Sequence, residues 1–100
     1  MSKQYTTDWL TAFLPDWDRH LYLLAAKGAK ALEVGTYEGR AACHLMYAYP
    51  ELQLDVVDYF VDLWNEGFEA RFDHNMAEYA GRFRKIKGKS EHVLPNLLDE

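Results

Sequence analysis

The chain has 100 residues, which is enough for one domain with a modest hydrophobic core. Apolar residues make up 49% of it, so the composition is typical of a folded globular protein rather than a disordered one. The formal net charge of −5 argues against the basic surfaces that bind nucleic acids or anionic membranes, and we expect neither kind of partner.

Residues 1–28 predict a helical lead-in to the rest of the chain. Thr7 and Asp8 can cap a short helix that Pro15 closes. Apolar residues then recur at helical spacing until Gly28, namely Trp17, Leu21, Leu24 and Ala25. The sequence therefore predicts two short helices before the first strand.

Residues 29–100 alternate between short apolar segments and helical ones. Strands are predicted over residues 30–34, 53–58 and 83–87, and helices begin near residues 40, 68 and 90. This alternation is typical of an α/β fold with parallel strands joined by right-handed crossovers. We predict a three-layer, Rossmann-like half-sheet with strand order 3-2-1, in which ligands bind beyond the carboxyl ends of the strands.

The stretch ALEVGTYEGR, residues 31–40, ends the first predicted strand in a tight turn with two glycines. Gly35 allows the chain to turn sharply, and Gly39 lets the next helix start close against the sheet. Backbone amides and the helix dipole can then meet a ligand at this turn. A dinucleotide fingerprint needs glycine where this chain has Tyr37, and Glu38 beside it would repel phosphates, so NAD, FAD and ATP are poor candidates.

A nucleoside that carries an amino acid in place of phosphates suits this turn better. The amino group of S-adenosylmethionine suits Glu33, directly or through water, and its carboxylate suits the amides of residues 37–39. An acid that closes the second strand, roughly 20 residues beyond the glycines, would bind the ribose hydroxyls. Asp58 stands 19 residues after Gly39, so we predict S-adenosylmethionine as the cofactor.

Three stretches resemble the first half of class I S-adenosylmethionine-dependent methyltransferases, especially the small-molecule O-methyltransferase-like groups: ALEVGTYEGRAA, LDVVDYF and RFRKIKGKSEHVLPNL. The resemblance covers residues 28–98. It implies that Glu33, Gly35 and Tyr37 line the methionine end, Asp58 and Tyr59 the ribose, and Lys89 and Ser90 the adenine edge. Thr36 and Gly39 complete the predicted cofactor-binding set, and no catalytic residue is assigned.

In that family a fourth strand carries an acidic motif that positions the methyl acceptor or a magnesium ion, and this sequence ends at Glu100, where that strand would begin. We therefore expect the chain to bind the cofactor without transferring methyl groups by itself. Completion by a missing C-terminal half or by a homodimer through the exposed edge of the first strand is expected. Two other functions stay open, a stand-alone binding or scaffold module and an enzyme that cleaves S-adenosylmethionine.

Plainer interpretations of the same residues also remain. Glu33 could form a salt bridge with Arg40, and Asp58 could cap the loop after its strand. The four histidines and Cys43 lack the spacing of metal ligands, so no metal is expected. The three tryptophans are predicted to pack within the protein rather than to cover the cofactor: Trp9, Trp17 and Trp64.

The cellular compartment is predicted from three features. Cys43 is a single cysteine and cannot form an internal disulfide, and no apolar stretch approaches the roughly 20 residues of a membrane span. The N-terminal sequence MSKQYTTDWL lacks the apolar segment of a signal peptide. A cytoplasmic protein is therefore expected.

Overall fold

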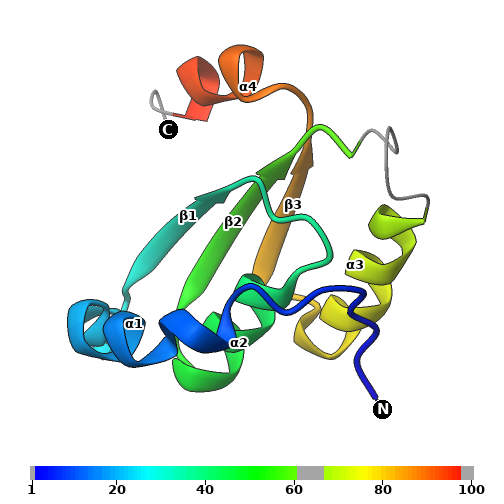
Figure 1. Ribbon diagram of the computed structural model, residues 1–100. Helices are drawn as coiled ribbons and strands as arrows, with labels where there is room; N and C mark the ends of the chain where they lie inside the picture. Colours follow the sequence, from blue (N-terminus) through cyan, green and yellow to red (C-terminus); the bar gives the residue numbers. More distant parts are fainter. Residues whose placement is uncertain (1, 61–66, 98–100) are drawn as a thin grey trace.

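The computed structural model describes residues 2–60 and 67–97, and its centre is a sheet of three parallel strands. The strands lie in the order β1-β2-β3 and cover Lys30–Val34, Gln53–Asp58 and Phe83–Lys87 (Figure 1). The predicted α/β half-sheet is confirmed, with the predicted bounds of all three strands. Gly35 directly follows β1 and Gly88 directly follows β3.

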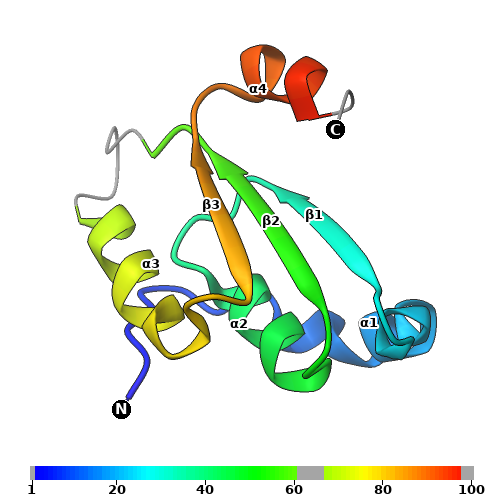
Figure 2. The ribbon, with the colours of Figure 1, turned by 180° about the vertical axis from the view of Figure 1, so that it is seen from behind.

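Helices connect the strands and follow the last one. They are α2 (Arg40–Ala48), α3 (Phe68–Met76), which continues into a 3₁₀ turn at Ala77–Tyr79, and α4 (Ser90–Leu97). Helices α2 and α3 lie on one face of the sheet, whereas α4 lies on the opposite side, where Leu94 and Leu97 border a cavity over β1 and β2 (Figures 1 and 2). On the face away from α2, the β1 side chains Leu32 and Val34 are about half exposed.

The N-terminal segment forms three short helical pieces, Thr11–Phe13, α1 (Leu14–His20) and Tyr22–Ala25. The prediction that Pro15 closes a helix is wrong, because Pro15 lies in the first turn of α1. Proline is tolerated there, since the first amides of a helix have no partner within the helix. Asp8 is placed as predicted for a cap, and its Oδ1 accepts a hydrogen bond of 3.1 Å from the Thr11 amide.

The hydrophobic core lies between the sheet and helices α2 and α3. Leu54 and Val56 of β2 are fully buried in it, together with Met46 of α2 and Phe72 and Met76 of α3. Several side chains of the N-terminal segment pack against the same core, namely Tyr5, Trp17, Leu21 and Leu24. Val57 of β2 is as fully buried as Leu54 and Val56, so this central strand is covered on both of its faces.

Gly39 has a different structural role from the one predicted. Its φ is 81°, and a Cβ at this position would lie 3.0 Å from the Phe72 ring and 3.3 Å from Met76. The glycine therefore lets α2 start close against α3 rather than against the sheet. No helix in the described part of the chain is long and apolar enough to cross a membrane.

Candidate functional site

Two neighbouring cavities lie at the carboxyl ends of the strands. The first, which we call the Lys89 cavity, measures about 460 Å³ and lies between the ends of β1 and β2 and the turn before α4. The second, the Trp9 cavity, measures about 440 Å³ and lies between the N-terminal segment, the glycine turn and the start of α3. Three residues line both cavities: Gly35, Asp58 and Tyr59.

Six of the nine residues predicted for the site line these cavities. Besides the three shared residues, Tyr37 lines the Trp9 cavity, and Lys89 and Ser90 line the Lys89 cavity. Glu33, Thr36 and Gly39 line neither cavity. Chain segments more than 50 residues apart thus meet at one edge of the sheet, because parallel strands end on the same side.

Asp58 connects the end of β2 to the glycine turn. Its Oδ2 accepts a hydrogen bond from the Tyr37 amide and its Oδ1 accepts one from the Phe60 amide, each at 2.9 Å. Tyr37 and Phe60 have φ values of 51° and 57°, a left-handed region that residues other than glycine rarely adopt. The capping interpretation of Asp58 is therefore correct, and each carboxylate oxygen still has a second lone pair for a ligand.

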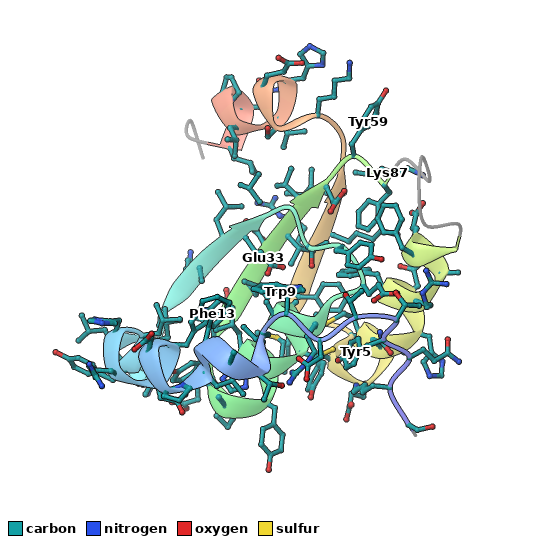
Figure 3. The ribbon with its side chains drawn as sticks, viewed as in Figure 1. Tyr5, Trp9, Phe13, Glu33, Tyr59 and Lys87 are labelled. Carbon is teal, nitrogen blue, oxygen red and sulfur yellow. The ribbon has the colours of Figure 1, made fainter. Side chains whose placement is uncertain are left out.

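Glu33 and Thr36 carry buried oxygen atoms without a hydrogen bond. Glu33 rises from β1 toward the face that the N-terminal segment crosses (Figure 3). Within the described residues, Glu33 Oε1 and Thr36 Oγ1 have no hydrogen bond of good geometry, although the Thr36 hydroxyl lies near enough to act on the Glu33 carboxyl. Burial raises the pKa of Glu33 to about 7; the Thr36 hydroxyl opposes this shift and the charge of Asp58 adds to it.

The proposed salt bridge between Glu33 and Arg40 is absent among the described residues. Arg40 instead lies 3.5 Å from Asp8, measured from Nε to Oδ1, and its guanidinium stands over the ring of Tyr5. Glu33 is therefore a partly buried carboxyl that its surroundings leave partly neutral near pH 7. Such a group can accept or release a proton at physiological pH.

The amides of the glycine turn are less available than predicted. The Tyr37 amide donates to Asp58, and the Gly39 amide donates to the Thr36 carbonyl at 2.9 Å. The prediction that a ligand carboxylate binds these two amides is therefore wrong. One amide of the turn is satisfied within the turn itself and the other by the acid at the end of β2.

Glu38 is buried and points to protein partners rather than to either cavity. It accepts hydrogen bonds from the amide and the hydroxyl of Thr6, at 2.9 and 2.8 Å, and from Nε of Arg71. Although burial opposes ionisation, these donors hold the pKa of Glu38 below its ordinary value. The ion pair with Arg71 weakens the repulsion of phosphates expected from Glu38, and the exclusion of phosphates stays a prediction.

Sequence reasoning missed three residues that line the Trp9 cavity: Thr7, Trp9 and Phe68. Trp9 was predicted to pack internally, yet its side chain is 47% exposed and its ring meets the edge of Trp17 at 6.4 Å. Trp17 packs against the core as predicted, whereas Trp64 lies outside the described residues. The sequence shows only that Trp9 precedes the first helix. That position does not reveal which residues its side chain contacts.

Solved structures with a similar fold were found for this chain, but they do not establish its activity. No protein-family model matches the chain, and no curated protein matches it. Among solved structures, it is similar to a proposed sarcosine dimethylglycine methyltransferase from Galdieria sulphuraria, with 20% identity, a TM-score of 0.54 and coverage of 85% of this chain and 29% of that one.

A second solved structure is coclaurine N-methyltransferase bound to N-methylheliamine and S-adenosylhomocysteine. Its identity is 12% and its TM-score 0.57, and the match covers 88% of this chain and 24% of that chain. The present chain thus spans less than one third of the length of either enzyme. It has a partial methyltransferase-like fold, an α/β half-sheet that corresponds to one part of these structures.

Proposed function

We propose that the chain binds S-adenosylmethionine across the Trp9 and Lys89 cavities and forms the cofactor-binding part of a small-molecule methyltransferase. The observation that carries this proposal is that the two cavities meet at Asp58, at the carboxyl ends of parallel strands. Each volume lies in the range of about 300–1,000 Å³ that is usual for small-molecule sites. The partial likeness to methyltransferase structures supports the same function.

The residues suggest how the ligand would lie. The adenine would occupy the Lys89 cavity beside Tyr59, Lys89 and Ser90, and the ribose hydroxyls would use the remaining lone pairs of Asp58. The methionine end would then enter the Trp9 cavity past Gly35. Gly35 has a φ of 83°, and a Cβ there would enter open space, so a side chain would take up room that the ligand needs.

The unpartnered oxygens beneath the turn suit the amino group of this ligand. Glu33 Oε1 and Thr36 Oγ1 line neither cavity, so a water molecule would have to bridge them to the ligand. An ammonium group would favour the charged form of Glu33 and lower its pKa from about 7. Methyl transfer belongs to the proposal only for a chain completed by further sequence or by a partner.

Calorimetry with S-adenosylmethionine and S-adenosylhomocysteine tests the proposal, with NAD as the ligand that is expected not to bind. Tyr59→Ala removes a ring that lines both cavities and is 51% exposed, so it is expected to weaken binding without unfolding the chain. Tyr47→Ala is the matched control, because Tyr47 is 80% exposed on α2 and lines neither cavity. Absence of heat and of a thermal shift at millimolar ligand would overturn the proposal.

A further inference from the structure

The Trp9 cavity has an unusual lining for a site on an acidic protein. Its walls are aromatic rings with one carboxylate and no lysine or arginine among the described residues, and the rings belong to Trp9, Tyr37, Tyr59 and Phe68. The carboxylate is that of Asp58. A cavity lined in this way attracts a positive charge, and Lys89 already stands over one of its rings, that of Tyr59.

The rings are held in place by contacts outside the cavity. The centroids of Tyr37 and Phe68 lie 5.2 Å apart with the planes tilted by 35°, and the hydroxyl of Tyr37 is 3.3 Å from that of Thr6. The rings of Trp9 and Trp17 form a T-shaped contact with centroids 6.4 Å apart. Contacts of this kind reduce the conformational entropy that the rings lose when a ligand enters.

Aromatic faces carry partial negative charge and attract a cation that lies within about 6 Å of the ring centroid. The chain already uses this attraction next to the cavity, where Nζ of Lys89 stands 5.2 Å from the centroid of Tyr59. Nζ of Lys85 likewise stands 4.7 Å from the centroid of Phe60. A cation with methyl groups gains more than an ammonium, since its apolar surface also leaves water.

We propose that the Trp9 cavity is a binding site for an onium group, a sulfonium or an ammonium that carries methyl groups. The inference rests on the proposed function and deepens it, because S-adenosylmethionine itself contains a methylated sulfonium. The same chemistry is offered by an alkylammonium methyl acceptor, and the experiment separates the two sources. Asp58 supplies the countercharge, while Trp9, Tyr37 and Phe68 supply the ring faces.

The test compares choline with 3,3-dimethylbutan-1-ol, which has the same shape but carbon in place of the charged nitrogen. Calorimetry at constant ionic strength is expected to show saturable binding of choline and about tenfold weaker binding of the alcohol, a difference of about 1.4 kcal/mol. Trp9→Leu is expected to reduce choline affinity about tenfold. Tyr47→Leu, on the exposed face of α2, is expected to leave it unchanged.

A second measurement needs no variant and guards against a Trp9 variant that fails to fold. The methyl protons of bound choline are expected to shift upfield in the NMR spectrum, because aromatic ring currents surround them. Equal affinity for choline and the alcohol, or choline binding without such a shift, would overturn the onium site.

Repetition with saturating S-adenosylhomocysteine identifies the source of the cation. Displacement of choline means that the cavity holds the sulfonium end of the cofactor, whereas simultaneous binding means that it holds the ammonium of an acceptor. Choline binding by a chain that binds neither adenosyl ligand would refute the proposed function and leave the onium site. If the chain binds S-adenosylmethionine but binds choline and the alcohol equally well, the proposed function stands and the onium site is refuted.

Discussion

The carboxylate of Asp58 holds the backbone amide of Tyr37, 21 residues earlier in the chain, at a distance of 2.9 Å. It thereby supports a left-handed backbone conformation in the turn that separates the two cavities. Its other oxygen does the same for Phe60. One side chain therefore shapes both loops that border the site.

Asp58→Ala is expected to lower the free energy of unfolding by about 2–4 kcal/mol, because two backbone amides lose a charged acceptor. Chemical denaturation measures this change. Asp55→Ala is the matched control on the same strand, since Asp55 pairs with Arg84 at the surface and is expected to contribute less than about 1 kcal/mol. Equal losses in the two variants would show that Asp58 does not support the loops.

Glu33→Gln tests the buried carboxyl through the pH dependence of stability. The folded-state pKa of about 7 lies above the ordinary value of 4.5, so the native chain keeps a proton that the unfolded chain has lost. The contribution of Glu33 to the free energy of unfolding is therefore greatest below about pH 4.5 and falls as the pH rises through 7.

Glutamine mimics the neutral carboxyl, so above pH 7 we expect the variant to be more stable than the natural chain by up to about 3 kcal/mol. Near pH 4.5 the two chains are expected to be equal. Denaturation midpoints measured across this range give the comparison. Glu91→Gln, at an exposed position in α4, is the control, and a difference between chains that does not vary with pH would contradict the assignment.

The bounds of the strands could be predicted because glycine and proline end secondary structure through local backbone geometry. Gly28 and Gly35 bracket β1, and Pro50 ends α2, so the backbone rules for glycine and proline were sufficient. The acid at the end of β2 could also be predicted, since the topology places it beside the glycine turn. Both predictions depended only on residues close together in the sequence and on the rule that parallel strands end on the same side of a sheet.

The partners of the glycine turn could not be predicted in the same way. Glu38 meets Thr6 and Arg71, which are 32 and 33 residues away, and no pattern in the sequence pairs them. Trp9 presents the same difficulty, because its exposure depends on how the N-terminal segment crosses the sheet. Residues whose environment is built by distant segments require the folded structure.

Gly39→Ala is expected to destabilise the chain by about 2–4 kcal/mol. The φ of 81° strains any side chain, and the new Cβ would also collide with Phe72. Gly28→Ala separates the two effects, because Gly28 has a similar φ of 79° but open space around its Cβ, and is expected to cost about 1–2 kcal/mol. Thermal and chemical unfolding of both variants measure the difference, and equal costs would mean that α3 moves aside.

The isolated chain is expected not to transfer methyl groups. Transfer needs an acceptor held in line with the sulfonium and, for oxygen acceptors, a base. Asp58 is the acid that lines the Trp9 cavity among the described residues, and both of its oxygens already accept backbone amides. Labelled S-adenosylmethionine incubated with amines, phenols and catechols should keep its label. Acceptor-dependent formation of S-adenosylhomocysteine that Trp9→Leu abolishes would contradict this expectation.

We propose that the free edge of β1 pairs with a second copy of the chain. The Gln53 amide donates to the Ala29 carbonyl and the Gly35 amide to the Val57 carbonyl, so by alternation the backbone groups of Lys30, Leu32 and Val34 point away from β2. Antiparallel pairing about Leu32 would set each Lys30 opposite a Val34, so that no like charges meet.

Light scattering is expected to give about twice the monomer mass of 11.7 kDa. Leu32→Pro removes an outward amide that β2 does not use, and we expect it to yield a monomer. Leu32→Ile keeps the amide and a similar volume, and it is expected to remain a dimer. If the unmodified chain is a monomer, the dimer proposal is refuted, whereas the proposed cofactor site is unaffected.

The contacts of Glu38 link the local unfolding of three chain segments. Its hydrogen bonds join the N-terminal segment and α3 to the glycine turn. Release of Arg71 would leave the buried carboxylate without its countercharge, and release of Thr6 would remove two of its hydrogen-bond donors. Separate fraying of these three segments is therefore costly, and we expect their amides to exchange with similar protection factors. Because the contacts span more than 30 residues, we also expect the turn to form after the local helices, an order that pulsed hydrogen exchange during refolding can check.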